Sequence, residues 1–233
     1  MSSASIARRG PRAVLVALVA AALAVALLAV GRHDDRAAYA AMDHVNTARA
    51  SALTAEQLRF HDQMRKLWED HVTWTRLAIV SFAGDVPDFD RTAARLRRNQ
   101  TDIGNAVKPY YGRRAGNRLT ALLKEHIAGA VELLKAAKAG DSSGFASAKT
   151  AWYRNGRQIA RFLSRANPRF LPFAAINRLM KGHLDQTLAE AAHRLGGDFA
   201  ADIRDYEHIH RHILRMADAL SNAIMKQFPG HFR

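Results

Sequence analysis

After residue 53 the apolar and polar positions follow the period of α-helices. Apolar residues recur three or four positions apart, and no segment alternates apolar and polar residues as a half-buried strand would. Glycine, proline and helix-capping residues divide the pattern into about six segments. We therefore predict an all-α domain. Its helices should run over about 54–83, 88–108, 112–140, 141–167, 172–196 and 198–228.

One short pattern occurs three times in this domain. Each copy reads leucine, apolar residue, two mostly polar positions, histidine, apolar residue, and a Gly-Asp step follows each copy at a similar distance. The histidines and the Gly-Asp steps recur every 55 to 57 residues, which is typical of repeated supersecondary units. We therefore predict a bundle of three antiparallel helical hairpins. The three copies are Leu67–Val72, Leu122–Ile127 and Leu179–Leu184.

The equal lengths of the helices place several polar side chains at one height. Each leg of 12 to 14 residues spans about 20 Å, so each histidine should face a polar residue of the returning helix if all turns lie at one end. Two of these residues come 14 residues after the aspartate of their Gly-Asp step, and the third comes 12 residues after it. All lie on apolar stripes and should point inward. The predicted pairs are His71 with Asn99, His126 with Asn155, and His183 with His210.

Three interpretations of this layer stay open. Neutral core histidines can fix the register of the helices, and imidazoles in a helical bundle can also bind a small ligand or a transition metal such as zinc, copper or iron. A histidine general base would imply an enzyme, which we disfavour because no nucleophile elbow, phosphate-binding glycine loop or His-Glu-x-x-His motif is present. His208 and His212, opposite His210, are expected in solvent. The candidate ligands are His71, His126, His183 and His210, surrounded by Asp70, Asn99, Asp102, Glu125, Asn155 and Glu207.

The first forty residues differ from the rest. Arg8, Arg9 and Arg12 precede an unbroken apolar run over 13–30, which is typical of an export signal and also long enough to anchor a protein in a membrane. We predict a signal peptide or membrane anchor over 1–31, a polar alanine-rich tether over 32–53, and the bundle over 54–229. The bundle should be periplasmic or extracellular, either released or held at the cytoplasmic membrane by residues 13–30.

The charge balance indicates which partners to expect. The formal net charge is +14; residues 1–40 contribute five arginines and two aspartates, which leaves +11 for the remainder. Such an excess favours anionic surfaces such as lipid headgroups or envelope polyanions. Nucleic acid is disfavoured because the arginines lack an interleaved aromatic pattern, and the absence of cysteine excludes disulfides and thiolate metal sites.

Three segments resemble those of a group of small exported bacterial helical proteins of undefined function. The similarity covers about residues 55–229 and implies export and a helical bundle, without implying an activity. Two hypotheses follow: an exported envelope protein that binds a metal ion or small ligand at the internal layer, or a ligand-sensing or interaction module with a basic surface and structural histidines. The segments that carry the resemblance are Leu67–Arg76, Gln100–Tyr111 and Met216–Ser221.

Overall fold

The computed structural model describes residues 37, 39, 40 and 53–233. No strand occurs in this part of the chain, which confirms the all-α prediction. Residues 53–233 form five α-helices and one short 3₁₀ helix. These are α3 (Ala55–Ala83), α4 (Phe89–Ala139), α5 (Ser142–Ala166), α6 (Phe173–Gly196), α7 (Phe199–Gln227) and η1 (Pro229–His231).

Local side-chain chemistry sets most of the helix boundaries. At the start of α3 the hydroxyl of Thr54 accepts from the backbone N–H of Gln57, whose own side chain accepts from the N–H of Thr54. Asp141 and Asp198 cap α5 and α7 through single bonds of the same kind, each 2.9 Å long. The glycines after α4 and α6 adopt left-handed φ values of 69° and 78°, which end these helices.

The second and third predicted helices are joined in α4. This 51-residue helix continues past Pro109, where we expected it to end, and departs from helical geometry only at Gly112, with φ 81° and ψ 165°. Such a φ suits glycine alone. The turn after Pro109 is held by tertiary packing, because the ring of Tyr110 stacks on Phe232 at 5.2 Å. The sequence therefore predicts a break between two helical runs, and the structure has this break at Gly112, three residues after Pro109.

The two halves of α4 cross closely at Gly104 and Gly116. A Cβ atom at Gly116 would lie 2.5 Å from the carbonyl oxygen of Gly104, and one at Gly104 would lie 2.7 Å from the carbonyl oxygen of Gly116. Backbones can approach this closely only where neither residue has a side chain.

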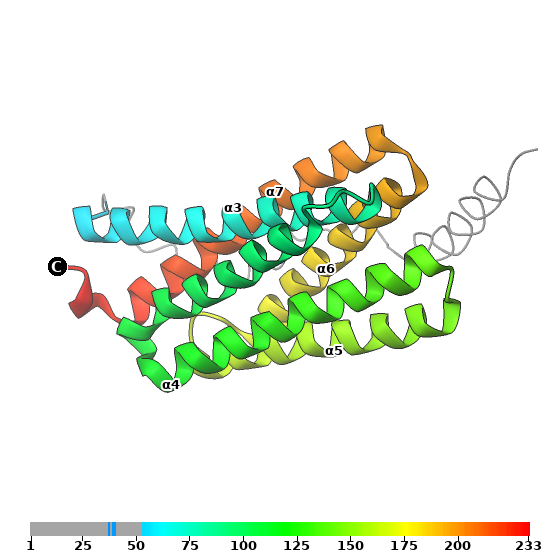
Figure 1. Cartoon of the computed structure of the whole chain (residues 1–233). Coiled ribbons are helices and arrows are strands. Elements are labelled where there is room, and N and C mark those ends of the chain that lie inside the picture. The colour runs from blue at the N-terminus through cyan, green and yellow to red at the C-terminus, as the bar shows by residue number, and fades with distance from the viewer. Residues whose placement is uncertain (1–36, 38, 41–52) are drawn as a thin grey trace, which may run out of the picture.

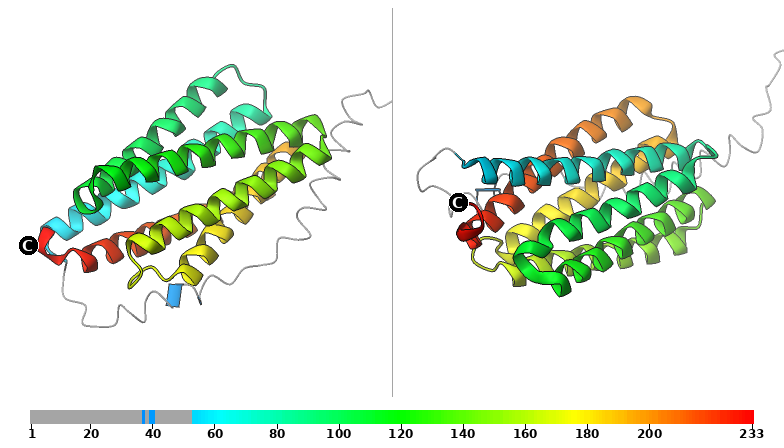
Figure 2. Two further views of the ribbon diagram at one scale, coloured as in Figure 1. Left: turned by 90° about the horizontal axis from the view of Figure 1, so that it is seen from below. Right: turned by 60° about the vertical axis from the view of Figure 1, so that its left-hand side comes forward.

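The helices pack in a closed order, α3 on α4, α4 on α5, α5 on α6, α6 on α7, and α7 back on α3. Figure 1 shows that the turns after α3, α4 and α6 lie at one end of the bundle. The break in α4, the connection from α5 to α6 and the C-terminus lie at the other end, as Figure 2 shows from two further directions. The turns after α3, α4 and α6 thus lie at one end, as a polar layer at one height requires.

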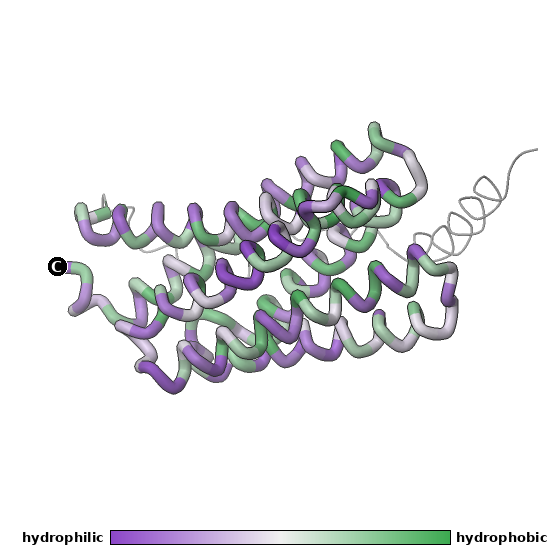
Figure 3. Tube along the Cα trace, viewed as in Figure 1, coloured by the Kyte–Doolittle hydropathy of each residue, from purple (hydrophilic) through white to green (hydrophobic). Residues whose placement is uncertain are grey.

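Apolar side chains of all five α-helices meet inside the bundle, and the hydropathy of the trace in Figure 3 alternates with the helical period. One large cluster fills the half toward the C-terminus, whereas the half toward the Gly-Asp turns holds several smaller clusters. Buried members of the large cluster include Met64, Ile103, Leu122, Ile159, Leu179 and Ile213.

The predicted N-terminal segments lie mostly outside the described residues, and the bundle continues past its predicted C-terminal end. The signal or anchor over 1–31 and most of the tether over 32–53 lie outside the described residues. Within the described part of the chain, no helix combines the length and the apolar character needed to cross a bilayer. At the other end the core continues past residue 229, since Phe232 is only 4 % exposed.

Candidate functional site

A layer of polar side chains does lie inside the bundle, and one hydrogen bond recurs in it. At three places a side chain of one helix donates to a carbonyl oxygen of the neighbouring helix, four residues before a histidine. His71, His126 and His183 are all buried. The three bonds join Asn99 Nδ2 to Leu67 O at 3.0 Å, Asn155 Nδ2 to Leu122 O at 3.2 Å, and His212 Nε2 to Leu179 O at 3.0 Å.

Two expectations for α7 are wrong. His210 lies at the surface rather than in the layer, and its Nε2 is 2.8 Å from a carboxylate oxygen of Glu69. His212, which we expected in solvent, is 1 % exposed and supplies the third donor. It comes 14 residues after Asp198, the same spacing that the two asparagines show. Strict use of that spacing identifies His212, whereas the apolar stripe of α7 misled us to His210.

Three of the four buried imidazoles form a column. The ring centres of His71 and His183 are 5.6 Å apart, and those of His183 and His212 are 6.4 Å apart with an angle of 5° between their planes. The ring of His126 stacks on Trp152 at 5.0 Å. The column therefore joins α3, α6 and α7, while His126 belongs to the contact between α4 and α5.

The hydrogen bonds of the imidazoles differ between the hairpins. Nδ1 of His126 donates to Oδ1 of Asn155 at 2.9 Å, because the amide nitrogen of Asn155 is already used on a backbone carbonyl. Nδ1 of His71 accepts from the side-chain nitrogen of Gln100 at 3.2 Å, and Gln100 in turn donates to Asn99. The predicted pair of His71 and Asn99 is thus bridged by a glutamine that we had not singled out.

Burial keeps these imidazoles neutral. Desolvation, reinforced by the nearby His126, lowers the pKa of His71 to about 3. Desolvation also lowers the pKa of His126 to about 4, although its bond to Asn155 acts in the opposite direction. The pKa of His183 lies well below its ordinary value, first through desolvation and then through the neighbouring imidazoles. A neutral imidazole offers one donor and one acceptor nitrogen.

None of the predicted carboxylates bonds to a buried imidazole. Asp70 and Glu207 pair with basic residues of their own helices. Glu125 is exposed and Asp102 is half-buried. The layer is therefore built from imidazoles and amides rather than from acids.

Metal binding at the layer stays a prediction. Among the residues that the structure describes, no group of three or more His, Asp and Glu side chains is arranged to hold a metal ion.

Several polar atoms around His71 are buried without a hydrogen-bond partner in the described part of the chain. They are Trp68 Nε1, Gln100 Oε1 and His183 Nδ1. The indole of Trp68 lies 5.8 Å from the His71 ring, so two of the three residues contact it through their rings. Buried polar groups normally find partners, so the layer keeps unused hydrogen-bonding capacity.

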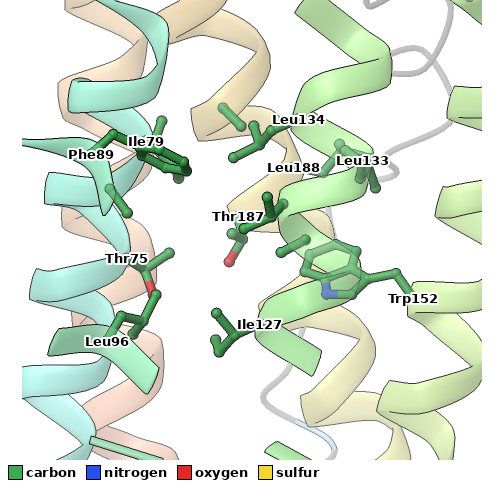
Figure 4. A pocket seen from close by; sticks show the side chains of 14 residues that line it. Thr75, Ile79, Phe89, Leu96, Ile127, Leu133, Leu134, Trp152, Thr187 and Leu188 are labelled. Carbon is green, nitrogen blue, oxygen red and sulfur yellow. The ribbon is translucent and has the colours of Figure 1, made fainter. Parts of the chain in front are cut away.

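An apolar cavity of about 50 Å³ adjoins the layer on the side of the Gly-Asp turns. Figure 4 shows Ile79 and Leu96 on one side of it and Ile127 and Leu134 on the other. The cavity is lined almost wholly by carbon, which favours a dry space over ordered water.

A buried ion-pair cluster ties α3, α6 and α7 together. Arg76 bonds to Glu190 at 2.8 Å and also to Asp202, which Arg194 approaches at 3.4 Å. Asp202 is fully buried, and burial raises the pKa of Glu190 to about 7 against the opposing effect of Arg76. The sequence analysis did not predict this cluster, because its residues do not belong to the sequence pattern that occurs three times.

The surface of α5 is basic from residue 149 to the end of the helix. Residues 142–184 contain eight lysines and arginines and no aspartate or glutamate. The exposed arginines of α5 form no ion pair with any described residue, whereas basic residues of α3 and α7 pair with acids. Grooves of about 410 Å³ and 350 Å³ flank α5 and are lined by arginine side chains. The α5 arginines are Arg154, Arg157, Arg161 and Arg165.

Comparisons of this chain with protein-family models, with curated proteins and with solved structures find no match. Function therefore has to be argued from the chemistry of these surfaces and side chains.

Proposed function

We propose that this protein is an exported binding protein, not an enzyme, whose basic α5 face docks on anionic lipid headgroups at the membrane surface. The observation that carries the proposal is the stretch over 142–184, which holds eight basic and no acidic residues. Its α5 arginines are exposed and form no ion pair with a described residue, although Arg157 and Arg161 lie over the ring of Phe173. The composition of residues 1–31 supports an envelope location.

The spacing of the α5 arginines fits a surface contact. Positions 154, 157, 161 and 165 fall within an arc of about 80° and extend over about 17 Å of helix. A basic residue close to an anionic membrane contributes about 1 kcal/mol, and the attraction falls off within a Debye length of about 8 Å at physiological salt. Docking should therefore be strong at low salt and weak at high salt.

Vesicle sedimentation tests this proposal. Full-length protein is mixed with vesicles of phosphatidylcholine with and without phosphatidylglycerol, and the measured quantity is the bound fraction that high salt removes, since residues 13–30 are apolar and add a salt-independent part. We expect Arg154→Glu, Arg161→Glu, Arg165→Glu to abolish the salt-sensitive fraction. A control that reverses Arg59, Lys66 and Arg211 on α3 and α7 should retain most of it. Equal losses in both variants would contradict docking through α5.

A second candidate function is binding of a metal ion or a small polar ligand in the histidine layer. It is favoured by the buried, unpartnered atoms of Trp68, Gln100 and His183. Elemental analysis of protein purified without an affinity tag, compared with His71→Ala, His126→Ala, tests the metal form of this proposal. Stoichiometric zinc, copper or iron that disappears in the variant would support it, and metal-free parent protein would count against it.

We also propose that the bundle is built from three repeated hairpins, the second beginning at the break in α4. The equivalent donor bonds to Leu67, Leu122 and Leu179 support this interpretation. The common placement of the three Gly-Asp turns supports it as well.

A further inference from the structure

Part of the basic face is a groove between α4 and α5. Its volume is about 410 Å³, and three arginines border it: Arg118 of α4, and Arg161 and Arg165 of α5. The other lining residues are Leu122, Gln158, Phe162 and Ala166.

The groove offers cationic groups without acidic neighbours. None of its lining residues is acidic, and Glu125, the first acidic residue after Arg118 on α4, is not among them. None of the three arginines forms an ion pair with a described residue. Each guanidinium carries five N–H donors in a planar fork that matches the oxygens of a phosphate group.

The floor of the groove distinguishes it from an open charged surface. Leu122 is buried and Phe162 is half-buried, and the guanidinium of Arg161 also lies 5.7 Å from the ring centre of Phe173, so carbon adjoins the charged groups. Charge-assisted hydrogen bonds are stronger where nearby carbon excludes water. A compact anion that several guanidinium groups can share is the ligand that suits this arrangement.

We propose that the groove between α4 and α5 binds a phosphate monoester group. The inference rests on the proposed function of the basic face and narrows it to one site. A phosphate monoester carries up to two charges and three terminal oxygens, whereas a phosphodiester carries one charge and two such oxygens, so three arginines prefer the monoester. The ligand can be a lipid headgroup such as phosphatidic acid, or free phosphate, which has a similar charge and at least as many terminal oxygens.

Calorimetric titration of full-length protein in neutral detergent micelles tests the site. The probes are inorganic phosphate, dihexanoyl phosphatidic acid and dihexanoyl phosphatidylglycerol. The groove variant is Arg118→Ala, Arg161→Ala, Arg165→Ala, and the control is Arg154→Ala, Arg157→Ala, Arg169→Ala, which removes the same charge from α5 and the turn after it. We expect phosphatidic acid to bind about tenfold more tightly than phosphatidylglycerol, with this preference lost in the groove variant and kept in the control.

The outcomes separate the sources and the two proposals. Tight binding of phosphatidic acid with weak binding of inorganic phosphate identifies a lipid headgroup, whereas equal affinities for the two identify phosphate itself. Equal affinities for the two lipids, or equal losses in the two variants, would overturn the groove site while leaving vesicle docking of the whole face intact. If the parent protein binds phosphate but shows no salt-sensitive binding to vesicles, the docking function is overturned and the phosphate site in the groove is retained. Circular dichroism spectra of both variants, compared with that of the parent protein, test that they remain folded.

Discussion

At the scale of single residues, the recurring feature is a side-chain N–H that reaches across to a helix carbonyl. Asparagine at positions 99 and 155 and histidine at position 212 differ in size and chemistry, yet each donates to the carbonyl oxygen four residues before a buried histidine. A carbonyl oxygen has two lone pairs, so it accepts this bond in addition to its helical bond. The donor is kept while the residue type changes, and in α7 the spacing of 14 residues after Asp198 identifies it, whereas the apolar stripe does not.

The first prediction concerns Asn155, which both donates and accepts in the interior. In Asn155→Leu, Nδ1 of His126 loses its acceptor and Leu122 O loses its second donor. Because a buried group without a partner costs about 1–3 kcal/mol, we expect urea unfolding to show a stability loss of about that size. Thr150→Leu, an exposed change on the same helix, should shift the stability by less than about 0.5 kcal/mol. A loss in Asn155→Leu no larger than in this control would refute the role assigned to the amide.

At the scale of whole elements, the sequence predicts helix ends well because their causes are local. Thr54, Asp141 and Asp198 cap helices through bonds that span only three residues. The end of the helix at Pro109 failed as a prediction because Tyr110 is held by a residue more than 100 positions away. The ion pairs of Arg76 failed for the same reason, since they depend on packing between distant helices.

The second prediction concerns the crossing inside α4. In Gly116→Ala the new methyl group would lie 2.5 Å from the carbonyl oxygen of Gly104, so the two halves must separate. Overpacking of this kind costs about 1–3 kcal/mol, which urea unfolding would measure. Gly196→Ala is the control, because no atom lies within 4 Å of its new methyl group. Equal stability of the two variants would show that the crossing tolerates a wider spacing than the structure has.

At the scale of the whole molecule, charges are distributed so that the α5 face is basic and the histidine layer at the centre is neutral. The net charge was readable from the sequence, but its concentration on one face depends on how α4, α5 and α6 are placed side by side. The buried histidines were predicted for three positions from the helical period, and their neutrality follows from the absence of carboxylate partners. Around His71, His126 and His183 the described residues supply only amides, indole rings and other imidazoles.

The neutral centre predicts that acid destabilises the bundle. An imidazole in the unfolded chain has a pKa of about 6.5, whereas the pKa values of His71 and His126 in the folded protein are about 3 and about 4, and that of His183 is also lowered. The unfolded chain therefore binds more protons below pH 6.5, so this stability is complete above that pH and is lost as the pH falls. Glu190 acts in the opposite sense, because its raised pKa of about 7 lets the folded protein take up a proton first.

Three protons against one leave a net uptake of about two protons on unfolding near pH 5.5, or about 3 kcal/mol per pH unit. We expect the urea midpoint to fall steeply across this range. Since each imidazole contributes about one proton, His126→Gln should make the pH dependence shallower by about 1 kcal/mol per pH unit, whatever it does to the stability at pH 8. His208→Gln, an exposed change on α7, should leave the slope unaltered. A midpoint that stays constant from pH 7 to pH 5 would mean that the folded protein accommodates charged imidazoles, and the neutral layer would then have to be abandoned.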